Sequence, residues 1–163
     1  MICLCRADFG PPESDGCLFL LVNGVRIPGM PTEMKLTSAL KEKLMAYLSF
    51  RPEILFVLLY GSAAEGLPSR DLDIGLFVNR TMVSAAADFD YGFTLANELE
   101  KIVSYPVDVR VINDAPLGFR YNVSRGIALV VNDEQIFYNF LERTWDEFLD
   151  FQPVAMQYLK EIR

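Results

Sequence analysis

Histidine is absent from this 163-residue chain, and several kinds of site are excluded with it. A chain without imidazole has no histidine-based nucleophilic triad, no histidine ligand for zinc and no histidine acid–base catalyst. Any general base must therefore be a carboxylate, a lysine, a tyrosine or a cysteine. Among these groups, only carboxylates are clustered along the sequence.

Cysteine is scarce: Cys3, Cys5 and Cys17 are the only ones, and all lie near the N-terminus. An odd number this small does not indicate a disulfide framework. The Cys-x-Cys pair does not complete a closed zinc site either, because such sites take four ligands. We interpret the three as reduced thiols, and we therefore expect a cytoplasmic protein.

Long apolar runs and excess positive charge are also missing. Hydrophobic residues make up 52% of the chain, which is enough for one domain with a core. No apolar run approaches the roughly 20 residues that a membrane-spanning helix needs, so we expect no membrane partner. The formal net charge of −7 disfavours binding to a phosphate backbone, so we expect no direct binding to nucleic acid.

The most informative stretch is Leu59–Val78, which reads LYGSAAEGLPSRDLDIGLFV. Asp71 and Asp73 lie two positions apart in a predicted strand, so their side chains share one face, and the apolar residues between and after them take the other. Two neighbouring carboxylates repel each other and are costly to bury unless something neutralises them. A pair of divalent cations would do so.

The segment before these aspartates predicts a phosphate site. Ile54–Tyr60 is a continuous apolar run, as in a strand buried on both faces. Gly61 then allows a tight turn, and Ser62 stands where the N-cap of a short helix would be. Free N–H groups at such a helix start bind phosphate. A phosphate site at this turn, together with the nearby carboxylates, suits chemistry on a nucleoside triphosphate.

A second predicted strand, Val107–Ile112, carries Asp108 and Arg110 on the face opposite its valines. If this strand lies beside the first, Asp108 completes a set of three carboxylates. From periodicity alone, Asp108 is either that third ligand or a solvated residue of an edge strand. Arg110 is either a counter-charge to the aspartates or a contact for phosphate or substrate, and we favour the counter-charge.

Other patterns predict the remaining elements. Asn23-Gly24 between Cys17–Val22 and Val25–Ile27 predicts a β-hairpin. A wide aromatic face after the predicted cap Asp133 belongs either to the core or to a partner interface, and Pro153 should break or kink that last helix. Helices are also predicted over Thr32–Phe50, Thr81–Val103 and Pro116–Arg125, with a short strand over Ile127–Val131.

The Gly-Ser turn and the Asp-x-Asp strand resemble the signature of the DNA polymerase β nucleotidyltransferase superfamily. They look most like the prokaryotic minimal nucleotidyltransferases (MNT), which are encoded beside HEPN-domain proteins. The Val107-Asp108-Val109 strand and the loop after it resemble that family's third-aspartate strand. The resemblance implies an α/β (α+β) fold with a mixed central sheet flanked by helices and an aromatic-rich C-terminal helix. We expect an N-terminal extension, residues 1–30, and a nucleotidyltransferase domain, residues 31–163.

The resemblance also implies a function. In HEPN–MNT pairs the MNT protein is an antitoxin that transfers AMP from ATP to a tyrosine hydroxyl of the HEPN ribonuclease toxin. Asp71, Asp73 and Asp108 would then be the catalytic metal ligands, holding two Mg²⁺ ions or Mn²⁺ in their place. Gly61 and Ser62 would bind the nucleotide. ATP is the implied substrate and a HEPN toxin the implied protein partner.

Two departures from the family pattern keep alternatives open. The segment from Ser62 to Asp71 is shorter than usual in the family, and Glu65 stands where many relatives carry arginine. One alternative is a catalytically degenerate antitoxin that neutralises its toxin by binding. Another is a nucleotidyltransferase acting on a small molecule such as an aminoglycoside, although relatives of that kind generally have an added helical domain.

Overall fold

The structure is a computed structural model of the chain, and it describes residues 19–22, 25–28 and 36–161. The chain divides into two compact units, Met1–Thr32 and Glu33–Arg163. The three cysteines, the expected helix cap Thr32 and the expected domain boundary near residue 30 lie outside the described residues.

The first unit contains a two-stranded antiparallel sheet of β1 (Phe19–Val22) and β2 (Val25–Pro28). Val22 pairs with Val25, and Phe19 pairs with Pro28. This register confirms the hairpin that the Asn-Gly pair predicts.

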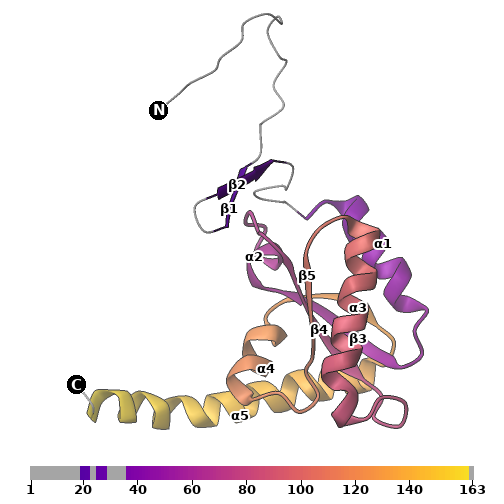
Figure 1. Cartoon of the computed structure of the whole chain (residues 1–163). Helices are drawn as coiled ribbons and strands as arrows, with labels where there is room; N and C mark the ends of the chain where they lie inside the picture. Colours follow the sequence, from indigo (N-terminus) through magenta and orange to yellow (C-terminus); the bar gives the residue numbers. More distant parts are fainter. Residues whose placement is uncertain (1–18, 23–24, 29–35, 162–163) are drawn as a thin grey trace, which may run out of the picture. The chain divides into compact units, whose positions relative to one another are not determined.

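The second unit is built on a four-stranded mixed sheet in the order β5–β4–β3–β6 (Figure 1). Its strands are β3 (Ile54–Tyr60), β4 (Leu72–Val78), β5 (Val107–Val111) and β6 (Ile127–Val131). β4 and β5 run parallel, while β3 is antiparallel to both of its neighbours. The two aspartate-bearing segments therefore lie side by side, and β5 is an edge strand.

Helices cover both faces of this sheet. Helices α1 (Ser38–Ser49) and α3 (Asp88–Val103) pack on one face, and α4 (Leu117–Ser124) and α5 (Glu134–Glu161) pack on the other (Figure 1). Alternate residues of β3 serve the two cores: Val57 faces α1 and α3, whereas Phe56 and Leu58 face α4 and α5. A strand buried on both faces is what its unbroken apolar run predicts.

Two helices begin later than predicted. Helix α1 starts at Ser38 rather than at Thr32, because Thr37 is its N-cap and accepts a hydrogen bond from the Leu40 N–H at 3.3 Å. Helix α3 starts at Asp88 rather than at Thr81. Before it, the Asn79 side chain accepts hydrogen bonds from the backbone N–H and the hydroxyl of Thr81, which favours a turn.

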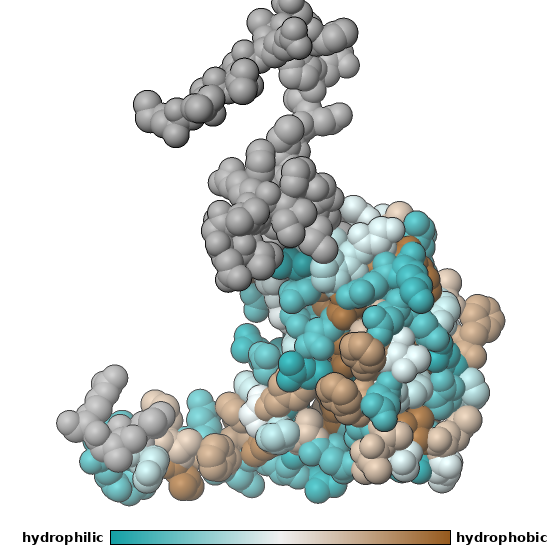
Figure 2. Space-filling model, in the orientation of Figure 1, coloured by the Kyte–Doolittle hydropathy of each residue, from teal (hydrophilic) through white to brown (hydrophobic). Residues whose placement is uncertain are grey.

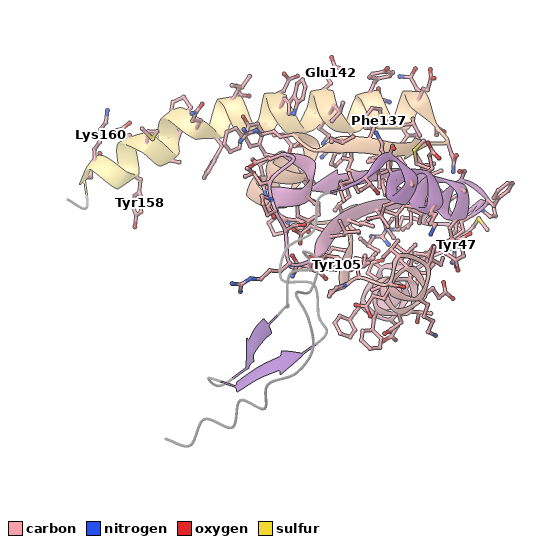
Figure 3. The ribbon with its side chains drawn as sticks, turned by 90° about the horizontal axis from the view of Figure 1, so that it is seen from above. Tyr47, Tyr105, Phe137, Glu142, Tyr158 and Lys160 are labelled. Carbon is pink, nitrogen blue, oxygen red and sulfur yellow. The ribbon has the colours of Figure 1, made fainter. Side chains whose placement is uncertain are left out.

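The last helix is longer than predicted. Asp133 caps it as expected, since its Oδ1 accepts a hydrogen bond from the Ile136 N–H at 2.9 Å. Pro153, however, lies inside the helix without ending it. Phe137 points toward the body of this unit and Glu142 away from it, while Tyr158 and Lys160 lie near the helix's far end (Figure 3). Within the described ranges, no helix has both the length and the hydropathy to cross a membrane.

The far end of α5 is also exposed, which explains why proline is tolerated there. A proline in a helix removes one backbone hydrogen bond and leaves a carbonyl one turn earlier without its partner. Pro153 and the residues before it are exposed, so water can satisfy that carbonyl.

Candidate active site

Asp73 and Asp108 are direct neighbours across the parallel strands β4 and β5. Leu72 and Ile74 enter the core under α1 and α3, so Asp73 between them points to the opposite face, where α4 lies. Val107 and Val109 flank Asp108 in the same way. The two carboxylates therefore lie on one face of the sheet, as the predicted pairing of the two strands requires.

Asp71 adds a third negative charge beside this pair. It lies just before the first residue of β4 and is exposed, whereas Asp73 is half-buried. Burial raises the pKa of Asp73, and the charges of Asp71 and Asp108 raise it further, while Arg110 opposes the shift. Asp73 is therefore a carboxylate whose ionised form is disfavoured by its surroundings unless a positive charge binds beside it.

The loop before Asp71 is anchored at both ends. At its start, the Leu67 N–H donates to the carbonyl of Ser62 at 3.0 Å. At its end, the hydroxyl of Tyr105 donates to the buried carbonyl of Ser69, and the Leu72 N–H donates to the carbonyl of Pro106 at 3.0 Å. Figure 3 labels Tyr105, which stands just before β5. These contacts tie the start of β4 to the start of β5.

Arg110 brings a positive charge to the site and pairs with Asp108. Its Nε lies 3.0 Å from Oδ2 of Asp108, and its guanidinium lies 5.7 Å from the centre of the Phe119 ring. The hydrogen bond from Arg110 to Asp108 raises the pKa of Arg110. This pairing is what the counter-charge interpretation of Arg110 predicts. The pair is partly open to solvent, with the side chains 60% and 44% exposed.

The Gly-Ser turn adjoins Asp73 from the other side. Gly61 has a φ of 70°, and a Cβ atom added to it would overlap Oδ2 of Asp73, so glycine is required for two separate reasons. The turn continues as the short helix α2 (Gly61–Ala64). The sequence predicts Ser62 as the N-cap of this helix, and that prediction is wrong. Tyr60 is the N-cap, and Ser62 lies inside the helix. The helix is one turn long, so its backbone N–H groups have no partner within it.

Two aromatic residues of the site, Tyr60 and Phe119, were not predicted from the sequence. Tyr60 pairs with Asp73 across β3 and β4, and its ring meets the edge of the Phe119 ring at a centroid distance of 5.6 Å. Burial and the charge of Asp73 both raise the pKa of the Tyr60 hydroxyl. Tyr60 directly precedes the Gly-Ser turn, and this adjacency was the available signal. No sequence pattern indicated that Phe119, which lies on α4, belongs to the site.

The donor atoms fit hard divalent cations. All three side chains offer carboxylate oxygens, the ligands that Mg²⁺ and Mn²⁺ prefer, and at Asp73 the repulsion from the other two is opposed by Arg110. Among the described residues, including the aspartates of this site, no group of three acidic or thiol side chains is already arranged to hold a metal ion. Binding would therefore draw Asp108 away from Arg110.

Two aspartates on paired strands, a third directly before one of them, and a glycine turn at the end of a further strand define a protein of the nucleotidyltransferase class. The chain belongs to the polymerase β nucleotidyltransferase family, whose model matches residues 42–135. The family resemblance drawn from the Gly-Ser and Asp-x-Asp motifs is confirmed, and with it the fold class and the nucleotidyltransferase activity. No curated protein matches the chain.

Solved structures of toxin–antitoxin complexes resemble the chain in fold. A chain of the MntA–HepT complex is 17% identical, with a TM-score of 0.57, and the match covers 77% of this chain and 98% of that one. A chain of a toxin–antitoxin complex with AMP-PNP is 19% identical, with a TM-score of 0.58 and coverage of 75% and 97%. A chain of the complex between a tri-AMPylated Shewanella oneidensis HEPN toxin and its MNT antitoxin is 17% identical, with a TM-score of 0.58 and coverage of 78% and 98%.

Proposed function

We propose that this protein is a metal-dependent antitoxin that transfers AMP from ATP to a tyrosine hydroxyl of a HEPN toxin. The observation that supports the proposal most is the pairing of Asp73 with Asp108 across β4 and β5, with Asp71 beside them and Gly61 against Asp73. A reaction that consumes ATP also agrees with the cytoplasmic location expected from the cysteines.

The structural relatives support the choice of acceptor. They are toxin–antitoxin complexes; one contains AMP-PNP, and another contains an AMPylated HEPN toxin. Those findings belong to those proteins, and we extend them to this chain because it shares their fold.

Asp71, Asp73 and Asp108 would hold Mg²⁺ or Mn²⁺. When bound, such ions neutralise charge on phosphate oxygens and on the attacking and leaving oxygens of the reaction. The backbone N–H groups at Gly61 and Ser62 would hold the phosphates of ATP, and the hydroxyl of Ser62 would add a contact.

The proposed reaction is a single displacement. The tyrosine oxygen forms a bond to the α-phosphorus of ATP, the bond from that phosphorus to its bridging oxygen breaks, and pyrophosphate leaves with the bonding electrons. The proton of the tyrosine passes to a carboxylate oxygen of Asp108. The protein contributes mainly by positioning the reactants and by matching the charge that develops.

Two observations favour a second candidate, an antitoxin that acts by binding alone. Arg110 engages Asp108, and Glu65, exposed at the end of α2, places an acid near the turn where phosphate would bind. In that case the fold would serve as a binding module.

The test is to co-express the chain with the protein encoded beside its gene and to measure the intact mass of that partner. The matched control combines Asp71→Asn with Asp73→Asn, which removes two charges with little change in side-chain shape. A gain of one or more AMP units that disappears in the control supports the transferase. A stable complex in both forms without any gain in mass identifies the binding module instead.

A further inference from the structure

A hollow of about 540 Å³ lies between helix α3 and the edge strand β5. Its lining includes Asp108 and Arg110, so the hollow borders the strand that carries the third aspartate. From α3, its lining includes Phe89, Phe93, Asn97 and Glu100.

Two contacts hold α3 close to β5 and so define the shape of the hollow. At Gly92, an added Cβ atom would lie 2.8 Å from the carbonyl oxygen of Val109, so only glycine permits this approach. Near the start of β5, the Val107 N–H donates to Oε1 of Glu100 at 3.2 Å. The hollow is therefore bounded by packed elements on both sides.

Phe89 and Phe93 project from α3 beside this hollow. Their side chains are 82% and 63% exposed, and their rings lie nearly parallel with centroids 6.4 Å apart. The space-filling view shows apolar side chains gathered over α3 and β5 (Figure 2). Large apolar side chains clustered on a surface and rimmed by polar residues commonly mark an interaction site.

The strand order places this hollow on the acceptor side of the site. The Gly61–Ser62 turn follows β3, Asp73 lies on β4, and Asp108 lies on β5. Adjacent strands are about 4.8 Å apart, so the turn and Asp108 lie on opposite sides of Asp73. A nucleotide with its phosphates on the turn and its α-phosphorus at Asp73 leaves the β5 side free for the attacking group.

We propose that the hollow, with the rings of Phe89 and Phe93 at its edge, docks the polypeptide segment of the acceptor protein that carries the target tyrosine. This inference rests on the proposed adenylyl transfer. Aromatic rings pack well against one another at protein interfaces, and Asp108 is among the residues that line the hollow.

The exposure of the two rings favours a polypeptide over a small molecule. A small ligand inside the hollow would leave most of the Phe89 ring in water, whereas a folded partner covers it. The acids at the rim are already engaged: Asp88 accepts from Arg80 at 2.5 Å, and Glu100 accepts from the Val107 N–H. An aromatic segment without strong positive charge therefore fits the surface.

The test compares the double variant Phe89→Ala, Phe93→Ala with the matched control Phe50→Ala, whose ring is 87% exposed at the end of α1. Transfer of AMP is measured over a range of concentrations of the HEPN-domain protein, and binding of AMP-PNP with Mg²⁺ is measured by calorimetry. We expect kcat/KM for the acceptor protein to fall about tenfold or more, mostly through KM, with AMP-PNP binding unchanged. The control should match the wild type.

Other outcomes overturn the inference. Unchanged kcat/KM in the double variant shows that the acceptor docks elsewhere. A parallel loss of AMP-PNP binding assigns the hollow to the nucleobase instead. If the wild type transfers no AMP at all, the proposed function has failed. The affinities of the wild type and the double variant for the HEPN-domain protein are then compared directly. Weaker binding by the double variant supports the docking surface, and equal binding rules it out.

Discussion

The Nε of Arg110 lies 3.0 Å from Oδ2 of Asp108, two positions away on the same face of β5. The carboxylate that would complete the metal site is thus held by a cation of the chain itself. A divalent ion must compete with this guanidinium for Asp108.

Replacing Arg110 with methionine should therefore strengthen the binding of divalent cations. We expect the Mg²⁺ concentration that gives half of the maximal thermal stabilisation to fall about two- to fivefold, in keeping with a partly exposed ion pair. Thermal melts at a series of Mg²⁺ concentrations measure this. Arg143→Met, which breaks the exposed Arg143–Glu147 pair on α5, is the control. Weaker Mg²⁺ binding in Arg110→Met would assign the arginine a supporting role instead.

Asp73→Asn should abolish transfer while leaving the fold at least as stable. Because the pKa of Asp73 is raised in the folded state, its ionised form costs stability at neutral pH. The stability contributed by the protonated carboxyl is fully present below the ordinary pKa of aspartate, about 3.9, and is lost as the pH rises through the raised value. The variant's advantage in melting temperature should thus be largest near pH 7 and shrink toward pH 4.

Melts of both proteins across that pH range check this, in metal-free buffer. Asp150→Asn, which replaces an exposed residue of α5, accounts for the loss of one negative charge far from the site. If the Asp73→Asn variant melts well below the wild type at neutral pH, the expected repulsion among the three aspartates is contradicted.

Gly61 and Gly66 form a matched pair for testing the turn. Both have positive φ, 70° and 72°, but only Gly61 lies against another side chain, that of Asp73. Gly66→Ala should cost about 1–2 kcal/mol of unfolding free energy through backbone strain alone. Gly61→Ala should cost more and should also weaken AMP-PNP binding. Denaturant titration and calorimetry measure the two effects, and equal losses would show that contact with Asp73 has no consequence.

The end of α5 should contribute little to the stability of the isolated chain. Large apolar side chains are exposed there, including Phe151, Val154, Met156 and Tyr158. A chain that stops after Asp150 keeps Phe148, whose ring stacks on Tyr121. Its unfolding free energy should lie within about 0.5 kcal/mol of the full chain in denaturant titration. A much larger loss would mean that the segment packs within the monomer.

Sequence patterns located the parts of the site that depend on local chemistry. The continuous apolar run of β3 and the alternation around Asp73 determine which residues are buried, so both strands were predicted correctly. Helix starts were less predictable, because more than one polar residue competes for the cap: Thr37, not Thr32, caps α1, and Asn79 forms a turn ahead of α3.

What escaped prediction depends on contacts between distant segments. Tyr60 and Phe119 meet only because α4 packs over the end of β3. The hollow between α3 and β5 likewise depends on Gly92, whose role is visible only once the carbonyl of Val109 lies against it. From the sequence alone, Gly92 indicates only a low helix propensity at that position.

The position of β5 at the edge of the sheet has a consequence for how the site opens. Asp73 lies on a central strand, whereas Asp108 lies on a strand paired on one side only. Edge strands can detach in partial openings that cost less than global unfolding. Amide hydrogens of β5 should therefore exchange with deuterium faster than those of β3. When β5 detaches, Asp108 leaves the site, and any activity that depends on Asp108 is lost. Most backbone amides of the protein are still protected from exchange in that state.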